Sequence, residues 1–246
     1  MQPYLSYVIP VYNGANTITS LCNDLIRLSE SFHWDYEIIL VDDFSKDHSR
    51  KVLTDLSENN SAIKSIFLSE NFGQQNALFC GLNFVTGHYV VTLDDDGQHP
   101  VFIIPQLLEK IKTGFHTVYA VTDVQYEQFY RNLGSKLTDK VFTYLLRKPK
   151  DKRISSFRIM EASLVEKIVD YPYRYVYLSA SIIQCTKKID HLYYNKKPRI
   201  MGQSNYTFMK QFRLFSRIII YYAPIPFLAL FRKKGLLYHI ERTINI

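Results

Sequence analysis

The chain of 246 residues is 47% hydrophobic and 15% aromatic, with 19 Tyr and 16 Phe. This composition excludes an intrinsically disordered chain and suffices for one α/β domain with a large core. The net charge of +7 is unevenly divided, because residues 1–125 hold 7 Lys and Arg against 15 Asp and Glu, whereas residues 126–246 hold 23 against 8. An acidic first half suits a metal and nucleotide site and a basic second half suits an anionic partner, although solvated lysine faces would give the same balance.

Through about residue 120, short apolar and β-branched runs alternate with amphipathic stretches, a pattern typical of a parallel α/β sheet. The first run follows the N-terminal residues directly, without the basic and apolar regions of a signal peptide. Helices are expected at the apolar stripes Ile18–Leu28 and Ala77–Val85, and Asp47 is expected to cap the helix between the second and third strands. The expected strands are Tyr4–Ile9, Tyr36–Val41, Ile63–Leu68, His88–Leu93 and Thr117–Val121.

Beyond residue 125 the alternation gives way to longer elements. We expect an amphipathic helix over about 125–146, a basic loop at 147–153, a strand at 154–160 and a shorter helix at 161–169. The three cysteines of the chain are too widely spaced for a disulfide framework or a zinc motif, which favours a reducing compartment.

The longest apolar run, Ile218–Phe231, contains Pro224 and Pro226 and is shorter than the roughly 20 residues that span a bilayer. Basic flanks around such a segment predict an interfacial helical segment on anionic lipid, with a helix packed on the core as the alternative. We therefore expect one globular domain at 1–210, an amphipathic membrane-interface segment at 211–246 and no full transmembrane helix. The flanking cations are Arg213, Arg217, Arg232, Lys233 and Lys234.

Ligands of open parallel sheets bind beyond the carboxyl ends of the strands, so the residues that follow each expected strand are the candidate binding residues. No P-loop or dinucleotide-binding glycine motif accompanies the first strand. The residues that follow the first four strands include Pro10, Tyr12, Asn13, Asp43, Asn71, Gly73 and the segment Asp94–Gln98.

The segment Asp94–Gln98 carries the strongest chemical signal in the chain. Asp94, Asp96 and Gln98 alternate along an extended stretch, so their oxygen atoms can point to one side. Such a set, with positions left for water and phosphate oxygens, suits Mg²⁺ or Mn²⁺ held against a diphosphate. The spacing of a calcium loop is absent, and a solvated acidic turn is the other reading.

At this point the chain resembles the GT-A fold glycosyltransferases of family 2, and among them the dolichyl- and polyprenyl-phosphate sugar transferases. The resemblance implies an α/β fold, Rossmann-like, with a mostly parallel central sheet flanked by helices. The order and spacing of several short motifs carry it through about residue 230. These are IPVYN at 9–13, VDDFSKD at 41–47, NFGQQNA at 71–77, DDDGQHP at 94–100, SFRIM at 156–160 and RIMGQS at 199–204.

The resemblance implies a role for each matched residue. Tyr12 would stack on the nucleotide base and Asp43 would accept a base N–H, although strand-end packing and a helix cap are the plain alternatives. Asp94, Asp96 and Gln98 would hold the cation, with Asp96 central to catalysis. The other nucleotide-sugar residues would be Pro10, Asn13, Asn71, Gly73, Asp95 and Arg199, and the acceptor-phosphate residues Arg131, Ser135 and Arg158.

Three positions depart from the family pattern, namely Gly14 in place of Glu, Ser156 in place of Asp and Asn205 in place of Lys. The second departure bears on mechanism, because a hydroxyl acceptor needs a general base and an ionised lipid phosphate needs none. The missing carboxylate therefore favours a phosphate acceptor, unless Asp123, Asp139 or Asp151 serves as the base.

The resulting hypothesis is an inverting glycosyltransferase that moves a sugar from a UDP- or GDP-sugar to a polyprenyl phosphate. Residues 1–125 would hold the donor and cation, and residues 126–210 the acceptor, at the cytoplasmic face of an anionic membrane. A transferase that glycosylates a saccharide hydroxyl is the first alternative, and a non-catalytic nucleotide-sugar or nucleic-acid binding protein is the second. No nucleic acid is expected as a partner, because no base-reading module is recognisable, and the oligomeric state stays open.

Overall fold

The computed structural model describes residues 4–122, 141–170, 175–194, 216–235 and 237–246. The strands are β1 (Leu5–Val11), β2 (Tyr36–Asp42), β3 (Ile63–Leu68), β4 (Tyr89–Thr92), β5 (Thr117–Thr122), β6 (Arg158–Glu161), β7 (Ile189–Tyr194) and β8 (Ile240–Ile244). The helices are α1 (Ile18–Ser31), α2 (Ser49–Asn59), α3 (Gln74–Leu82), α4 (Ile104–Ile111), α6 (Ala162–Val169), α7 (Leu178–Cys185) and the short η1 (Val101–Ile103), η3 (Val141–Leu145) and η4 (Pro226–Phe231).

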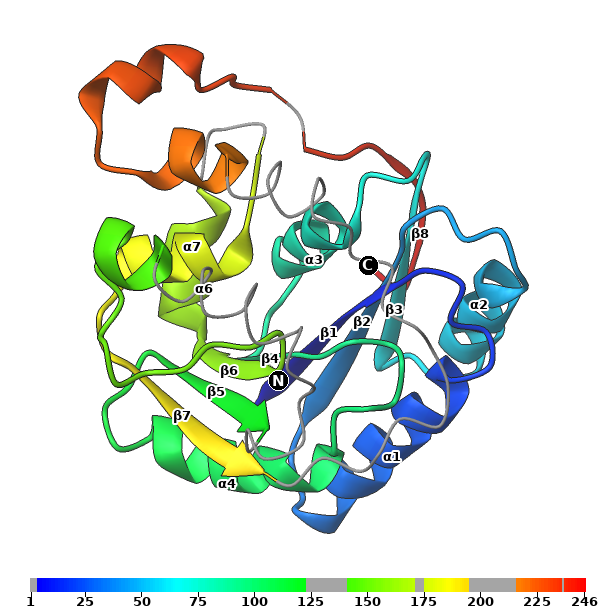
Figure 1. The fold of residues 1–246 in the computed structure, drawn as a ribbon. Coiled ribbons are helices and arrows are strands. Elements are labelled where there is room, and N and C mark those ends of the chain that lie inside the picture. The colour runs from blue at the N-terminus through cyan, green and yellow to red at the C-terminus, as the bar shows by residue number, and fades with distance from the viewer. Residues whose placement is uncertain (1–3, 123–140, 171–174, 195–215, 236) are drawn as a thin grey trace.

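Within the described residues, eight strands form one sheet in the order β7-β5-β6-β4-β1-β2-β3-β8 (Figure 1). The strands β4, β1, β2 and β3 run parallel to one another, and β7 runs parallel to β5. β6 is antiparallel to both of its neighbours, and β8 is antiparallel to β3. The predicted α/β fold with a mostly parallel sheet is therefore confirmed.

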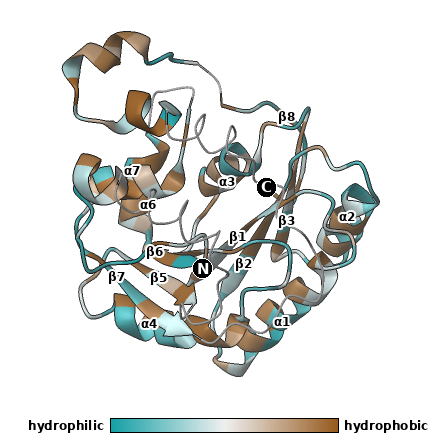
Figure 2. Cartoon of the chain, viewed as in Figure 1, coloured by the Kyte–Doolittle hydropathy of each residue, from teal (hydrophilic) through white to brown (hydrophobic). Residues whose placement is uncertain are grey.

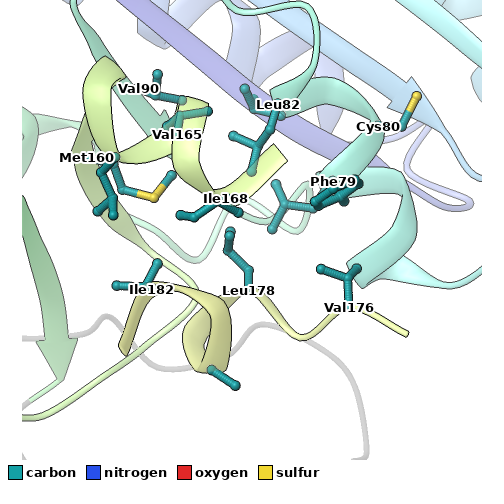
Figure 3. Packing of buried hydrophobic residues seen from close by; sticks show 14 of the residues in the cluster. Phe79, Cys80, Leu82, Val90, Met160, Val165, Ile168, Val176, Leu178 and Ile182 are labelled. Carbon is teal, nitrogen blue, oxygen red and sulfur yellow. The ribbon is translucent and has the colours of Figure 1, made fainter. Parts of the chain in front are cut away.

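Helices cover both faces of this sheet (Figure 1). Apolar residues of α1 and α4, such as Leu25 and Leu107, pack with one face of the strands. Apolar residues of α3, α6 and α7, such as Leu82, Val165 and Ile182, pack with the other face (Figure 3). The apolar sides of the helices thus form two core layers, with the sheet between them.

Close packing fixes the position of α3 on the sheet. A Cβ atom added at Gly81 would lie 2.5 Å from Val8 Cγ1 of β1 and 3.0 Å from Val41 Cγ2 of β2. These distances are shorter than ordinary van der Waals contacts, so only glycine allows this approach. The first residue of α3, Gln74, is thereby held at the carboxyl edge of the sheet.

The five strands predicted before residue 122 are all present, with ends that differ by at most two residues. Asp47 is not the capping residue of α2, because the helix begins one residue later than predicted, with His48 at the cap position; the Asp47 carboxylate instead accepts the Ser49 N–H at 2.9 Å. The sequence analysis did not predict α4, α7, β7 or β8. Most of the helix expected over 125–146 lies outside the described residues.

The C-terminal part has both a buried and an exposed portion. Residues 216–222 are helical, and Ile218 and Tyr222 are buried against the core. The Tyr222 hydroxyl accepts the Tyr177 N–H, directly before α7, at 2.8 Å. The expectation of lipid contact along all of Ile218–Phe231 is therefore wrong for this first portion, which packs on the protein.

In η4, by contrast, Phe227 is 65% exposed and Leu230 is 80% exposed. Figure 2 shows the hydrophobic colouring of this segment. The chain then returns to the sheet as β8, which sequence analysis had placed in the membrane-interface segment. None of the helices in the described ranges has the length and hydropathy required to cross a bilayer.

Candidate active site

A cavity of about 450 Å³ lies at the carboxyl ends of β1, β2, β3 and β4. The parallel strands end side by side there, so residues that are far apart in sequence meet. The lining residues are Pro10, Val11, Tyr12, Asp43, Asn71, Gly73, Gln74, Asp94, Asp95 and Asp96. Most of the predicted donor and cation residues are among them, whereas Asn13, Gln98 and the predicted acceptor residue Arg158 are not.

Asp43 links the end of β2 to the start of α3. Its two carboxylate oxygens accept the backbone N–H groups of Phe72 at 2.7 Å and Gly73 at 2.9 Å, and Asn71 Nδ2 donates to its carbonyl oxygen at 3.0 Å. Burial raises the pKa of the Asp43 carboxyl to about 6, although the two N–H groups oppose this shift. Asp43 therefore anchors the two residues that precede α3 while it also lines the cavity, and no side chain caps the helix itself.

Tyr12 presents its ring at the cavity, with 48% of the residue exposed. An exposed ring at this place is not explained by strand-end packing, which was the alternative to base stacking. Asn13 adopts a positive φ of 57°, and its side-chain oxygen accepts the Lys46 N–H at 2.8 Å. Asn13 thus joins the loop after β1 to the loop after β2, and its contact with the donor stays a prediction.

Asp95 holds the backbone beside the Tyr12 ring. Its Oδ2 atom accepts the Tyr12 N–H at 3.0 Å, and a Cβ atom added at Gly14 would lie 2.6 Å from the same oxygen. The missing side chain at Gly14 therefore leaves room for this carboxylate. Burial, with help from the charges of Asp94 and Asp96, raises the pKa of Asp95 to about 6.

Asp94 receives hydrogen bonds on both carboxylate oxygens. Gln74 Nε2 donates to Oδ1 at 2.7 Å, and Ser156 Oγ donates to Oδ2 at 2.8 Å. His99 Nδ1 accepts the Asp94 N–H at 3.0 Å, and its Nε2 atom lies 3.6 Å from Oδ2. Sequence analysis assigned no role to Gln74 or His99, although both lie within motifs that carried the family resemblance.

Asp96 is exposed, and its Oδ1 atom accepts the Gln98 N–H at 3.0 Å. Asp94, Asp95 and Asp96 all line the cavity, and Asp95 Oδ2 also accepts the Tyr12 N–H. Asp94 and Asp96 are the two carboxylates that the sequence predicts as cation ligands. Across the ranges that the structure describes, no group of three or more His, Cys, Asp or Glu side chains is arranged to hold a metal. Two carboxylates completed by diphosphate oxygens and water are nevertheless the usual ligands of Mg²⁺, so the residues fit such a cation.

Arg158, the first residue of β6, is only 2% exposed. Its Nη1 atom donates to Ser179 Oγ at 3.0 Å, and its Nε atom donates to the Ser156 carbonyl oxygen at 3.3 Å. The guanidinium therefore binds α7 to the start of β6, and its contact with an acceptor phosphate stays a prediction. Arg131, Ser135 and Arg199, together with the alternative bases Asp123 and Asp139, lie outside the described residues.

The sheet order and the acidic cavity at the carboxyl ends define an α/β protein of the GT-A class. Among solved structures, glucosyl-3-phosphoglycerate synthase from Mycobacterium tuberculosis, in complex with Mn²⁺, UDP-glucose and phosphoglyceric acid, superimposes with a TM-score of 0.62. The sequences are 18% identical, and the match covers 89% of this chain and 78% of that one. At this identity the match supports the fold alone.

The chain belongs to glycosyl transferase family 2, which matches residues 6–173. It is 29% identical over 223 residues to undecaprenyl-phosphate 4-deoxy-4-formamido-L-arabinose transferase of Enterobacter sp. strain 638, covering 90% of this chain and 68% of that protein. It is 27% identical over 228 residues to bactoprenol glucosyl transferase of Shigella phage SfX, covering 90% and 73%. The prediction of a glycosyltransferase is confirmed.

Proposed function

We propose that the chain transfers a sugar from a UDP- or GDP-sugar to a polyprenyl phosphate, with inversion at the anomeric carbon. One observation carries this proposal: a single cavity joins an exposed ring at Tyr12 and the Asp43 carboxylate to the carboxylates of Asp94 and Asp96. The first pair suits a nucleotide base, and the second suits a cation on the diphosphate. The names of the two relatives support a polyprenyl phosphate as the acceptor.

The donor would lie across the carboxyl ends of the strands. Its base would stack on Tyr12 and donate an N–H to Asp43, and its diphosphate would lie beside Asp94 and Asp96, which would hold Mg²⁺ or Mn²⁺. When bound, the cation would stabilise the negative charge that develops on the leaving diphosphate. Arg199 is proposed to contact the same phosphates.

The acceptor step needs no carboxylate at position 156. An oxygen of the lipid phosphate is already ionised near neutral pH, so it can attack the anomeric carbon directly. The new bond forms between this oxygen and the anomeric carbon while the bond from that carbon to the diphosphate oxygen breaks, and the nucleoside diphosphate leaves. Arg131, Ser135 and Arg158 are proposed to position the acceptor phosphate.

The membrane contact is proposed at η4, on the cytoplasmic face. Its exposed Phe227 and Leu230 are followed by the exposed cations Lys233 and Lys234, a combination that suits an anionic lipid surface. The Arg232 guanidinium has another role than the predicted lipid contact, because it donates to the carbonyl oxygens of Ile220 and Ala223.

The test of the reaction is nucleoside diphosphate release by the purified chain with Mg²⁺ or Mn²⁺, detergent-dispersed polyprenyl phosphate and a panel of UDP- and GDP-sugars. Release that requires the lipid phosphate is expected, with a loss of about 100-fold or more in Asp96→Ala. Asp55→Ala, at an exposed position of α2, is the matched control. Release that instead requires a saccharide hydroxyl acceptor contradicts the lipid assignment, and the absence of cation-dependent donor binding contradicts the enzyme mechanism.

The test of the membrane contact is flotation with vesicles that contain anionic lipid. The double variant Phe227→Glu and Leu230→Glu is expected to lose vesicle binding, because it places charge at the two most exposed large apolar side chains of η4. Phe32→Glu is the control, since Phe32 is 49% exposed at the end of α1. Equal loss in both variants, or in neither, contradicts a contact through η4.

A further inference from the structure

Ser156 stands where the family resemblance led us to expect an aspartate, and the structure gives its hydroxyl a defined partner. Ser156 Oγ donates to Asp94 Oδ2 at 2.8 Å, across 62 positions of sequence. The contact exists because β6 runs antiparallel beside β4, so the residue that precedes β6 by two positions meets the residue that follows β4 by two positions.

The backbone around Ser156 is fixed from several sides. Its carbonyl oxygen accepts the Thr92 hydroxyl of β4 at 2.9 Å and the Arg158 Nε–H at 3.3 Å. The next residue, Phe157, stacks on His99, with ring centroids 5.0 Å apart and planes inclined by 19°. A hydroxyl held in this way can keep one direction for the Asp94 carboxylate.

Resting on the proposed function, we propose that Ser156 and Gln74 are positioning residues that orient the Asp94 carboxylate toward the donor cation. Gln74 fixes Oδ1 from α3, and Ser156 fixes Oδ2 from the start of β6. A carboxylate has about four acceptor sites, so both oxygens keep a site for the cation. Exposed Asp96 has no comparable pair of side-chain donors among the described residues, so Asp94 is the ordered ligand of the two.

The chemistry of the two donors matters as much as their positions. A hydroxyl and an amide are neutral, so they orient the carboxylate without cancelling its charge, whereas a lysine would compete with the cation. An aspartate at position 156 would instead add a fourth carboxylate to the segment that already holds Asp94, Asp95 and Asp96. Ser156 is thus a supporting group of the cation site in this chain.

The test is Mn²⁺ binding, measured by electron paramagnetic resonance in the presence of UDP, for wild type, Ser156→Ala, Ser156→Thr and Gln74→Ala. Ser156→Ala and Gln74→Ala are each expected to weaken Mn²⁺ binding about 10-fold, the loss typical when a supporting hydrogen bond to a metal ligand is removed. Ser156→Thr keeps the hydroxyl and should restore most of the affinity. Ser155→Ala is the matched control, because Ser155 Oγ donates to the carbonyl oxygens of Ala120 and Phe157 and not to Asp94.

Circular dichroism melts establish that each variant is folded. Gln74→Ala keeps the test decisive if Ser156→Ala is unstable, because it removes the other side-chain donor to Asp94. In donor turnover, the Mn²⁺ concentration that gives half-maximal rate should rise in parallel with the dissociation constant. Unchanged Mn²⁺ affinity in Ser156→Ala, with or without lost turnover, overturns the positioning role. Failure of the wild type to bind Mn²⁺ with UDP contradicts the proposed function itself, so the two failures are distinguishable.

Discussion

Replacement of Asp43 by asparagine probes a buried charge that the fold retains at the cavity of the candidate active site. Burial raises the pKa of this carboxyl from 3.8 to about 6, with the largest contribution from desolvation. A carboxyl whose pKa is raised on folding keeps its proton in the folded state while the unfolded chain is already ionised. The folded state therefore loses stability as pH rises between about 4 and 6, and the difference in pKa corresponds to about 3 kcal/mol.

The expected result is a pH-dependent difference between wild type and Asp43→Asn. Asparagine does not titrate, so the unfolding free energy of wild type relative to the variant should fall by about 3 kcal/mol from pH 4 to pH 7. Urea unfolding at constant ionic strength without added cation measures this difference, and the remaining carboxylates largely cancel in the comparison.

Asp47→Asn is a matched control for which the expected change of stability with pH has the opposite sign. Hydrogen bonds from Ser49 and Ala15 lower the pKa of Asp47 despite the opposing desolvation, so Asp47 stabilises the fold above its titration range. The unfolding free energy of wild type relative to Asp47→Asn should therefore rise with pH. A difference for Asp43→Asn that is flat, or that rises like the control, would refute the assignment of Asp43 as a destabilising buried charge.

The same variant separates stability from ligand binding. At pH 7.5, Asp43→Asn should bind UDP in the presence of Mn²⁺ about 10-fold more weakly, because it loses one charge-assisted hydrogen bond to the base, worth about 1.5 kcal/mol. Isothermal titration calorimetry measures this loss. Unchanged UDP affinity would leave Asp43 only as the anchor of the backbone before α3 and contradict its proposed contact with the base.

Three further substitutions test the packing, the base site and the C-terminal strand. Gly81→Ala should lower the unfolding free energy by about 1–3 kcal/mol in urea titrations, because the new Cβ would lie 2.5 Å from Val8 Cγ1. Tyr12→Ala should weaken UDP binding about 10-fold or more through lost stacking, whereas Tyr12→Phe should stay near wild type in the same calorimetry. Arg50→Ala should lower the melting temperature more than Glu241→Ala, because Arg50 also lies 3.6 Å from a carboxylate oxygen of the fully buried Asp42, which would lose its cation.

Local sequence patterns were sufficient for the first half of the fold. Short apolar runs, separated by amphipathic stretches, identify the strands up to residue 122, because a strand buried on both faces is apolar along its whole length. The rule that ligands bind at the carboxyl ends of parallel strands then brings Tyr12, Asp43 and Asp94 into one cavity, as the structure shows. The meeting of these three residues was predictable because Tyr12, Asp43 and Asp94 each follow a strand within two positions.

Burial in the second half was not predictable from the same patterns. The apolar run Ile218–Phe231 reads as one segment, yet Ile218 and Tyr222 are buried while Leu230 is 80% exposed. Hydrophobicity gives the tendency of a side chain to leave water, but the neighbouring elements decide whether a surface is available to receive it. Here α7 provides that surface for Tyr222, through the Ser181 hydroxyl at 3.0 Å and the Gln184 amide that donates to the Tyr222 carbonyl oxygen.

The sequence by itself determined the class of fold, the family and the acidic motif, because these follow from short segments whose residues are neighbours in the chain. The tertiary structure alone decided that Ser156 meets Asp94 and that β8 closes the sheet beside β3. Both contacts depend on strand order and strand direction, which join residues separated by 62 positions in the first case and by more than 150 in the second. Such pairings are set by the packing of the whole chain, and no local periodicity encodes them.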